Sequence, residues 1–252
     1  MALRIFSYNI LEGGGDRLPL IASLIQQQQP DVVALLEARS VSNVEALAQQ
    51  LGMHVAVGMA SNTLKDHVAW LSRFPIVRTE NHPLILSKTL LEIEIYWQGA
   101  PLTLFATHLK AAQDRENEQR RVAEMQAILR FLRTHPNQLH ALVGDLNTVH
   151  PGDQVNAAEW IAVLKERGKK NPAPQFPRQV IPLLLEADYV DCYRTIHPAA
   201  SGYTTHTGHP ALRIDYIFAS PPFAQHLFAC DIVTGEEAEK ASDHFPVWAE
   251  FR

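Results

Sequence analysis

The stretch His140–Asn147 constrains the fold of this chain more than any other. It reads His-Ala-Leu-Val-Gly-Asp-Leu-Asn, an apolar run that stops at Gly144 and then presents Asp145 and Asn147. Such a run is typical of a buried strand, and a glycine removes side-chain bulk where another group approaches the backbone. If the strand geometry continues, the carboxylate and the amide share one face and suit a phosphoryl group with a metal ion and a water. The alternative is a turn whose side chains cap their own backbone.

The composition predicts one globular domain that covers residues 1–252. The chain has 252 residues, of which 46% are hydrophobic, so it can bury a sizeable core. A net charge of −5 argues against a protein that binds long nucleic acid through an overall positive charge. It is compatible with a local basic patch. Cys192 and Cys230 fit no close metal or redox spacing, so we expect reduced, buried thiols.

The sequence shows neither a targeting segment nor a membrane span. No apolar stretch near the N-terminus is followed by a small-residue cleavage site, and no run reaches membrane-spanning length. We therefore expect a cytoplasmic protein without stable membrane insertion. A monomer is favoured, although the sequence leaves the oligomeric state open.

Hydrophobic periodicity predicts strands in hairpins interleaved with helices. Strands are expected at 3–10, 31–37, 54–57, 67–71, 90–97, 102–109, 140–147, 213–218, 227–233 and 245–251. Helices are expected at 18–29, 42–51, 114–133 and 157–167, with a short helix or turn at 183–187. Two packed sheets with helices outside would bury such a set, which indicates an α/β (α+β) fold.

Polar side chains recur where the predicted strands end or start. They are Asn9, Glu37, His108, Asp145, Asn147, Asp215, Asp243 and His244. Carboxylates gathered with amides and imidazoles, without a cysteine cluster, suit Mg²⁺ or Mn²⁺ better than a structural zinc. Taken singly, these residues have structural alternatives: Asn9 could cap the glycine loop, Glu37 could cap the following segment, and Asp215 could pair with Arg213 or Arg73.

Six short motifs follow one another along nearly the whole chain. They are Ser7-Tyr8-Asn9-Ile10, Pro30-Asp31-Val32 with Glu37, Thr107-His108-Leu109, Gly144-Asp145-Leu146-Asn147, Arg213-Ile214-Asp215-Tyr216-Ile217-Phe218 and Ser242-Asp243-His244-Phe245-Pro246. In this order they resemble the endonuclease/exonuclease/phosphatase superfamily, the deoxyribonuclease I-like fold. The resemblance implies a four-layered sandwich of two mixed β-sheets flanked by helices, and cleavage of phosphoester bonds with a divalent metal.

The resemblance also implies a metal site. Glu37 matches the main metal-ligating carboxylate of the family, and Asn9 and Asp243 match residues that support the metal or its waters. Some members carry an acidic residue two positions after the first asparagine, where this chain has Leu11. We therefore expect one Mg²⁺, with Mn²⁺ as the alternative metal.

The remaining matched residues carry implied roles in the reaction. Asp145 resembles the residue that orients or deprotonates the attacking water, and Asn147 the amide that holds a phosphate oxygen. His244 resembles the imidazole at the scissile phosphate, and Asp215 its carboxylate partner. His108 matches a histidine of the nuclease and sphingomyelinase branches, where it stabilises the pentacovalent state or protonates the leaving oxygen. Which group is the base and which the acid stays open.

These features predict a Mg²⁺-dependent phosphodiesterase that hydrolyses a phosphoester by metal-assisted attack of water. DNA or RNA, a lipid headgroup and a small phosphodiester are the candidate substrates, and the acidic net charge weakens the nucleic-acid reading. The alternative is a catalytically silent phosphate-binding module of the same fold. The complete set of polar residues argues against that alternative.

Basic residues outside the motifs suggest simpler roles. We expect Arg115, Arg120 and Arg121 to form ion pairs on the surface of the helix at 114–133. The basic loop from Arg167 to Arg178 could meet an anionic substrate or simply be solvated.

Overall fold

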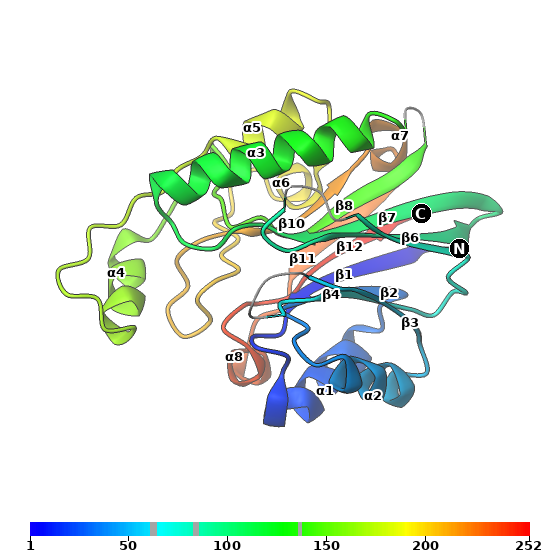
Figure 1. Ribbon diagram of the computed structural model, residues 1–252, viewed down its shortest axis with the longest axis horizontal. Helices are drawn as coiled ribbons and strands as arrows, with labels where there is room; N and C mark the ends of the chain where they lie inside the picture. The colour runs from blue at the N-terminus through cyan, green and yellow to red at the C-terminus, as the bar shows by residue number, and fades with distance from the viewer. Residues whose placement is uncertain (61–64, 83–85, 136–137) are drawn as a thin grey trace.

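In the computed structural model, the strands form two mixed six-stranded sheets that pack face to face (Figure 1). The structure describes residues 1–60, 65–82, 86–135 and 138–252. The first sheet has the order β11-β12-β1-β2-β4-β3, with β1 (Leu3–Asn9), β2 (Val32–Leu36), β3 (His54–Gly58), β4 (Val68–Ser72), β11 (Leu227–Ile232) and β12 (Val247–Phe251). The second has the order β5-β6-β7-β8-β10-β9, with β5 (Arg78–His82), β6 (Leu90–Trp97), β7 (Ala100–His108), β8 (Leu139–Asp145), β9 (Val190–Asp191) and β10 (Asp215–Ala219).

Helices cover the outer face of each sheet, which completes the predicted four layers (Figure 1). The first sheet is covered by α1 (Leu18–Gln28), α2 (Val41–Leu51) and α8 (Glu236–Ala241), and the second by α3 (Arg115–Leu132) and α5 (Val180–Leu185). The remaining helical segments are η1 (Gly15–Arg17), α4 (Ala157–Glu166), α6 (Cys192–Ile196) and α7 (Pro221–Ala224). Within the described residues, none of the helices combines the length and apolar character that a membrane span requires.

The alternation of side chains along each strand divides the core in two. In β1, Leu3 and Ile5 lie between the sheets, whereas Phe6 and Tyr8 pack against the helices outside. In β8, Val143 likewise faces the other sheet and Leu142 faces α3 and α5. Side chains alternate with a period of two along a strand. Every second residue after Ile5 or Val143, as far as the end of the strand, therefore also points between the sheets.

Two parallel strand pairs at the centre of the sheets bring several strand ends to one edge. β1 pairs in parallel with β2, and β7 pairs in parallel with β8. The antiparallel partners β12 and β10 run the opposite way, so each begins at the edge where β1 and β8 end. The loops at this edge therefore carry the polar residues that follow or precede the central strands.

Gly144 allows β7 and β8 to approach closely just before this edge. A Cβ atom at Gly144 would lie 1.9 Å from the carbonyl oxygen of Thr107 in β7, and the backbone has a φ of +148°. A side chain there would both overlap the neighbouring strand and strain the backbone. The predicted close approach at this glycine is confirmed.

A buried ion pair on α3 anchors the loops behind this edge. Glu118 and Arg121 are almost completely buried, and Arg121 Nε donates to Glu118 at 2.8 Å. Arg121 Nη1 also donates to the carbonyl oxygens of Lys110 and Ala112, each at 2.7 Å. The predicted surface position of Arg121 is therefore wrong, because the loop that follows β7 folds over its guanidinium.

We expect Gly144→Ala to lower the free energy of unfolding by roughly 2 to 4 kcal/mol, because overlap and backbone strain add. Gly99→Ala is the matched control, since Gly99 has a φ of +81° but nothing lies within 4 Å of the added Cβ. Strain alone should cost about 1 kcal/mol there. Urea denaturation of both variants measures the difference, and equal losses would contradict the close approach.

We expect Arg121→Leu to lower the free energy of unfolding by roughly 3 to 5 kcal/mol, because Glu118 is left charged and buried without its partner. Arg120→Leu is the control: Arg120 pairs with Glu116 at 2.7 Å on the exposed face of the same helix. Losing an exposed pair should cost less than about 1 kcal/mol. Similar denaturation midpoints for the two variants would show that the buried pair does not support the loops.

Candidate active site

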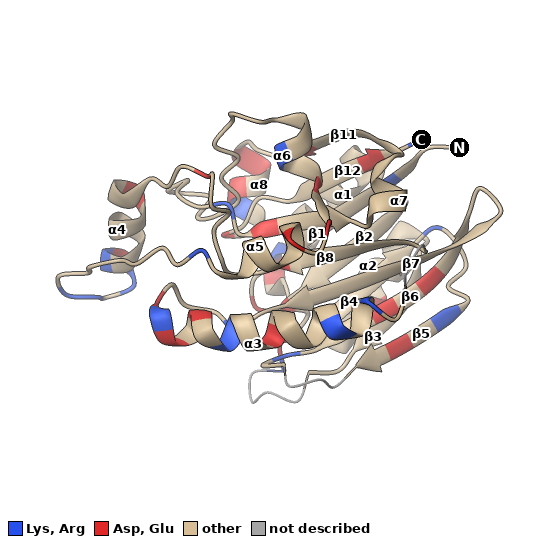
Figure 2. Ribbon diagram, turned by 90° about the horizontal axis from the view of Figure 1, so that it is seen from above, with Lys and Arg blue, Asp and Glu red and all other residues tan. Residues whose placement is uncertain are grey.

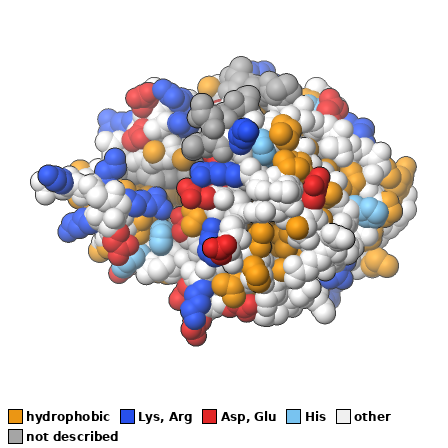
Figure 3. All heavy atoms as spheres, turned by 60° about the horizontal axis from the view of Figure 1, so that its bottom comes forward, with side chains coloured by type: hydrophobic (Ala, Val, Ile, Leu, Met, Phe, Trp, Pro, Cys, Tyr) orange, Lys and Arg blue, Asp and Glu red, His pale blue; other side chains and the backbone are white. Residues whose placement is uncertain are grey.

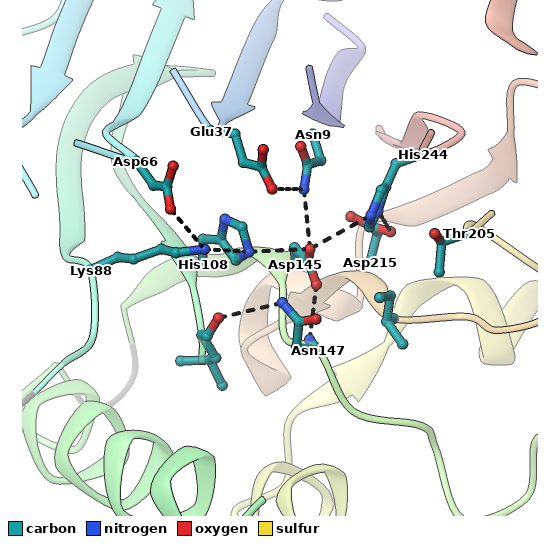
Figure 4. A network of polar contacts seen from close by, with 12 residues as sticks. Asn9, Glu37, Asp66, Lys88, His108, Asp145, Asn147, Thr205, Asp215 and His244 are labelled. Carbon is teal, nitrogen blue, oxygen red and sulfur yellow. Dashed lines mark hydrogen bonds and ion pairs between the residues drawn. The ribbon is translucent and has the colours of Figure 1, made fainter. Parts of the chain in front are cut away.

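All of the predicted site residues meet at this edge of the two sheets, and all but Asp243 are labelled in Figure 4. A pocket of about 390 Å³ opens there. Its lining includes Glu37, His108, Asp145, Asn147, Asp243 and His244. Asn9 and Asp215 lie beneath these residues and contact them through hydrogen bonds. The sequence pattern therefore identified a single cluster rather than scattered caps.

Strand alternation explains why four of these side chains point toward one another. Asn9, His108, Asp145 and Asp215 continue the inner-facing series of β1, β7, β8 and β10. In the second sheet the register places Asp145 directly opposite both His108 and Asp215. The site is thus the polar end of the core that fills the space between the sheets.

Asn9 connects the two sheets across the site. Its Nδ2 donates to Asp145 Oδ2 at 3.2 Å and to Glu37 Oε1 at 3.3 Å. Its Oδ1 accepts from the backbone N–H of Leu11 at 3.1 Å, so Asn9 also caps the glycine loop, as the structural alternative expected. Glu37 has a φ of +56°, a strained conformation that is common at functional sites.

His244 and Asp215 form a buried pair. His244 Nδ1 donates to Asp215 Oδ2 at 2.8 Å, and its Nε2 lies 4.0 Å from Asp145 Oδ2. Burial lowers the pKa of His244, but the charge and hydrogen bond of Asp215 oppose it. Together with the charges of Asp145 and Asp243, they raise that pKa to about 10. Arg213 instead pairs with Asp153 and Asp191, so the expected alternative of an Arg213–Asp215 pair is wrong.

Asp145 and Asn147 reach the pocket through a turn rather than a continued strand. β8 ends at Asp145, Asn147 has a φ of +51°, and its backbone N–H donates to Asp145 Oδ1 at 2.9 Å. The predicted continuation of the strand to Asn147 is therefore wrong, yet both side chains line the same pocket. Burial, followed by the nearby charge of Asp215, raises the pKa of the Asp145 carboxyl.

His108 has a neighbour that the sequence did not reveal. Lys88, which is only 8% exposed, places Nζ 2.6 Å from His108 Nε2 and 3.7 Å from Asp66 Oδ2. Asp66 also accepts from Arg39 Nε at 2.7 Å. Burial, and after it the charge of Lys88, lowers the pKa of His108 well below its usual value. Asp66 and Lys88 each lie two residues before a strand, β4 and β6, but they belong to none of the six motifs, so the sequence analysis missed them.

Helix α4 forms the opposite rim of the pocket. Trp160 and Arg167 contribute to the lining, and Arg167 Nη2 contacts Asp243 Oδ2 at 3.1 Å. Arg167 belongs to the basic loop noted in the sequence, which therefore begins at the site itself. His209, in the loop between α6 and β10, contacts Glu159 and Glu166.

The donor set of the pocket fits a hard divalent cation. Ligand atoms of Asp145, Asp215 and His244 lie within 4.8 Å of one another. His244 Nδ1 already bonds to Asp215, so only Nε2 of that ring is open, and the other open ligands are oxygens. Asp215 Oδ1 and Asp243 Oδ1 are buried without a hydrogen-bond partner among the described residues. Unpaired buried carboxylate oxygens are costly unless a cation or water meets them.

A second group of possible metal ligands, Glu80, His82 and Glu92, lies on β5 and β6. There Glu92 is already bonded to His82 and to Arg78. The arginine compensates the charge of Glu92, so this group has less need of a metal ion than the pocket has.

Comparison with known proteins finds chains of similar sequence and similar fold. Exodeoxyribonuclease III of Haemophilus influenzae is 24% identical over 99% of this chain and 100% of its own length. An AP endonuclease from Archaeoglobus fulgidus superposes with a TM-score of 0.78 at 21% identity, with 99% of each chain covered. The 3′ phosphatase NExo from Neisseria, bound to a product DNA hairpin, gives 0.75 at 21% identity with the same coverage.

A family model settles the classification. The model of the Endonuclease/Exonuclease/phosphatase family matches residues 6–244, a span that contains every motif residue of the pocket from Asn9 to His244. The chain therefore belongs to the Endonuclease/Exonuclease/phosphatase family and is a phosphoric ester hydrolase.

Proposed function

We propose that this protein is a Mg²⁺-dependent phosphodiesterase that acts on DNA, with Mn²⁺ as the alternative metal. The observation that carries the proposal is the convergence of Asp145, the His244–Asp215 pair and the Glu37–Asn9 contact on one pocket. This arrangement offers an acceptor for a water, an imidazole for the phosphate and an oxygen-rich place for a metal.

The metal would be held by Glu37, Asn9 and Asp243. When bound, it would neutralise phosphate charge and polarise the phosphoryl group. Asp243 Oδ2 contacts Arg167, whereas Oδ1 is buried and has no hydrogen-bond partner in the described part of the chain. Asn9 holds Glu37 and Asp145 at fixed positions through its amide nitrogen, so the site is preorganised before substrate arrives.

The residues of the second sheet would handle the water and the phosphate. Asp145 would accept a hydrogen bond from the attacking water, and Asn147 would donate its amide to a phosphate oxygen. Asp215 accepts a hydrogen bond from His244 Nδ1, which orients the ring so that Nε2 faces Asp145 and the pocket. His108 lies on the other side of Asp145, with Nε2 3.3 Å from Oδ2, and belongs to the same catalytic group.

The choice of DNA rests on the relatives and on local charge. The related proteins include an exodeoxyribonuclease, an AP endonuclease and a phosphatase bound to a DNA hairpin. Basic residues gather on the arm formed by α4 and its following loop, which starts at the pocket (Figures 2 and 3). Lys165, Arg167, Lys169 and Lys170 are exposed there, despite the net charge of −5 of the chain. Such a patch suits a phosphate backbone.

We expect Asp145→Asn and His244→Gln each to lower kcat/KM for Mg²⁺-dependent DNA hydrolysis by at least about a hundredfold, because each removes a group at the reacting centre. His209→Gln, a histidine paired with surface glutamates, is the control and should match wild type. The measurement uses duplexes with an abasic site, a 3′ phosphate or a plain 3′ end, compared with bis-p-nitrophenyl phosphate.

The comparison of duplexes with the small ester distinguishes the candidate functions. Cleavage of a duplex with higher kcat/KM than the small ester supports DNA as substrate. Cleavage of the small ester alone would redirect the proposal to a small or lipid phosphodiester. Binding of DNA without turnover, by folded protein with saturating Mg²⁺ or Mn²⁺, would establish the silent module instead.

A further inference from the structure

Lys88 is a buried cation inside the active site that the proposed reaction does not yet use. Its Nζ lies 2.6 Å from His108 Nε2, and the carboxylates of Asp66, Asp145 and Glu37 are close enough to act on its charge (Figure 4). This contact decides what His108 can do, because an imidazole nitrogen can serve only one hydrogen bond along its axis.

The donor and acceptor roles follow from the chemistry of the two groups. A lysine ammonium has three donors and no acceptor, whereas a neutral imidazole has one donor and one acceptor. A nitrogen 2.6 Å from the ammonium must therefore accept, so His108 Nε2 is unprotonated and the proton is on Nδ1. Nδ1 is buried and has no hydrogen-bond partner among the described residues. Among the described residues, Lys88 is therefore the contact that selects the Nδ1-protonated tautomer of His108.

The segment that carries Lys88 is fixed on both sides. The backbone N–H of Ser87 donates to Glu124 Oε1 of α3 at 2.6 Å, and Thr89 Oγ1 donates to Asn81 Oδ1 of β5 at 2.5 Å. Glu124 also accepts from the backbone N–H of Lys110, just after His108. The carboxylate of Glu124 therefore links the segment that carries Lys88 to the segment that carries His108. This link fixes the positions of the two side chains relative to each other.

We propose that Lys88 is a positioning residue that holds His108 as a neutral, Nδ1-protonated ring and places a fixed positive charge behind it. In this arrangement His108 does not protonate the leaving oxygen, in contrast to the role implied by the motif. The positive charge of Lys88 polarises the imidazole ring, and the ring in turn acts on Asp145, whose Oδ2 lies 3.3 Å from Nε2. The catalytic part of the inference rests on the proposed function, whereas the tautomer does not.

The tautomer is tested first, in metal-free protein and without substrate. Long-range ¹H–¹⁵N spectra of the imidazoles, with His108 assigned by difference from His108→Gln, should show Nε2 unprotonated and Nδ1 protonated. In Lys88→Met, whose side chain is similar in length, the proton should move to Nε2, where it can bond to Asp145. A protonated Nε2 in wild type, or the same tautomer in both proteins, would overturn the proposal.

The catalytic consequence is tested by steady-state hydrolysis of the best duplex. Lys88→Met should lower kcat roughly tenfold or more with little change in KM, and Lys88→Arg, which keeps a donor and a charge, should recover part of that loss. Lys240→Met, an exposed lysine paired with Glu236 on α8, is the control. His108→Gln, whose carboxamide oxygen can still accept from Lys88, should retain more activity than His108→Phe.

The outcomes separate this inference from the proposed function. Equal, near-complete loss in His108→Gln and His108→Phe would restore His108 as a proton donor and overturn the proposal. So would an unchanged kcat in Lys88→Met. Absence of any hydrolysis by wild type would remove the proposed function alone, because the spectra still report whether Lys88 sets the tautomer.

Discussion

The period-two alternation of side chains in two facing sheets is the constraint on which the site depends. Once Ile5 and Val143 are committed to the space between the sheets, Asn9 and Asp145 must point into the same space at the strand ends. A slip of one residue in either strand would turn these side chains toward the helices. The hydrophobic core therefore determines the orientation of the polar group that continues it.

That orientation places carboxylates where water is scarce, and the surrounding residues offset the cost. Asp145 and Asp215 are at most 2% exposed, and their neighbours include the amide of Asn9 and the imidazole of His244. A buried carboxylate is stable only when paired or hydrogen-bonded. Because some oxygens in the pocket still lack a partner among the described residues, a cation is the natural complement of the group.

Helix α3 supports the site from the second sheet without contributing a side chain to the pocket lining. Glu118 and Arg121 hold the loop after β7, and Glu124 ties that loop to the segment that carries Lys88. Buried charges on one helix thus fix the backbone on which His108 and its partner are mounted. Such supporting hydrogen bonds keep a site within the tolerance that catalysis requires.

The sequence alone located the central strands and placed the candidate site residues at their ends, because alternation and apolar runs are local signals. It missed β5, whose run from Arg78 to His82 is mostly polar and exposed, and it missed β9 and the short helices α6 to α8. In β5 and β9, pairing with β6 and β10 rather than an intrinsic pattern selects the strand conformation. The three helices are only four to six residues long, too short to show a helical period. Asn147 likewise left the strand because its backbone bonds to Asp145.

The residues and contacts of the site also divide into those that the sequence indicates and those that only the tertiary structure decides. Residue type and spacing singled out the acids, amides and imidazoles that the structure brings together around the pocket, and their catalytic roles stay predictions. The tertiary structure alone decided that Lys88 bonds to His108, that Asp66 joins Lys88 to Arg39, and that Arg121 is buried. These contacts join segments with no shared pattern, and the physical reason is that a hydrogen bond between loops depends on where the rest of the chain places them.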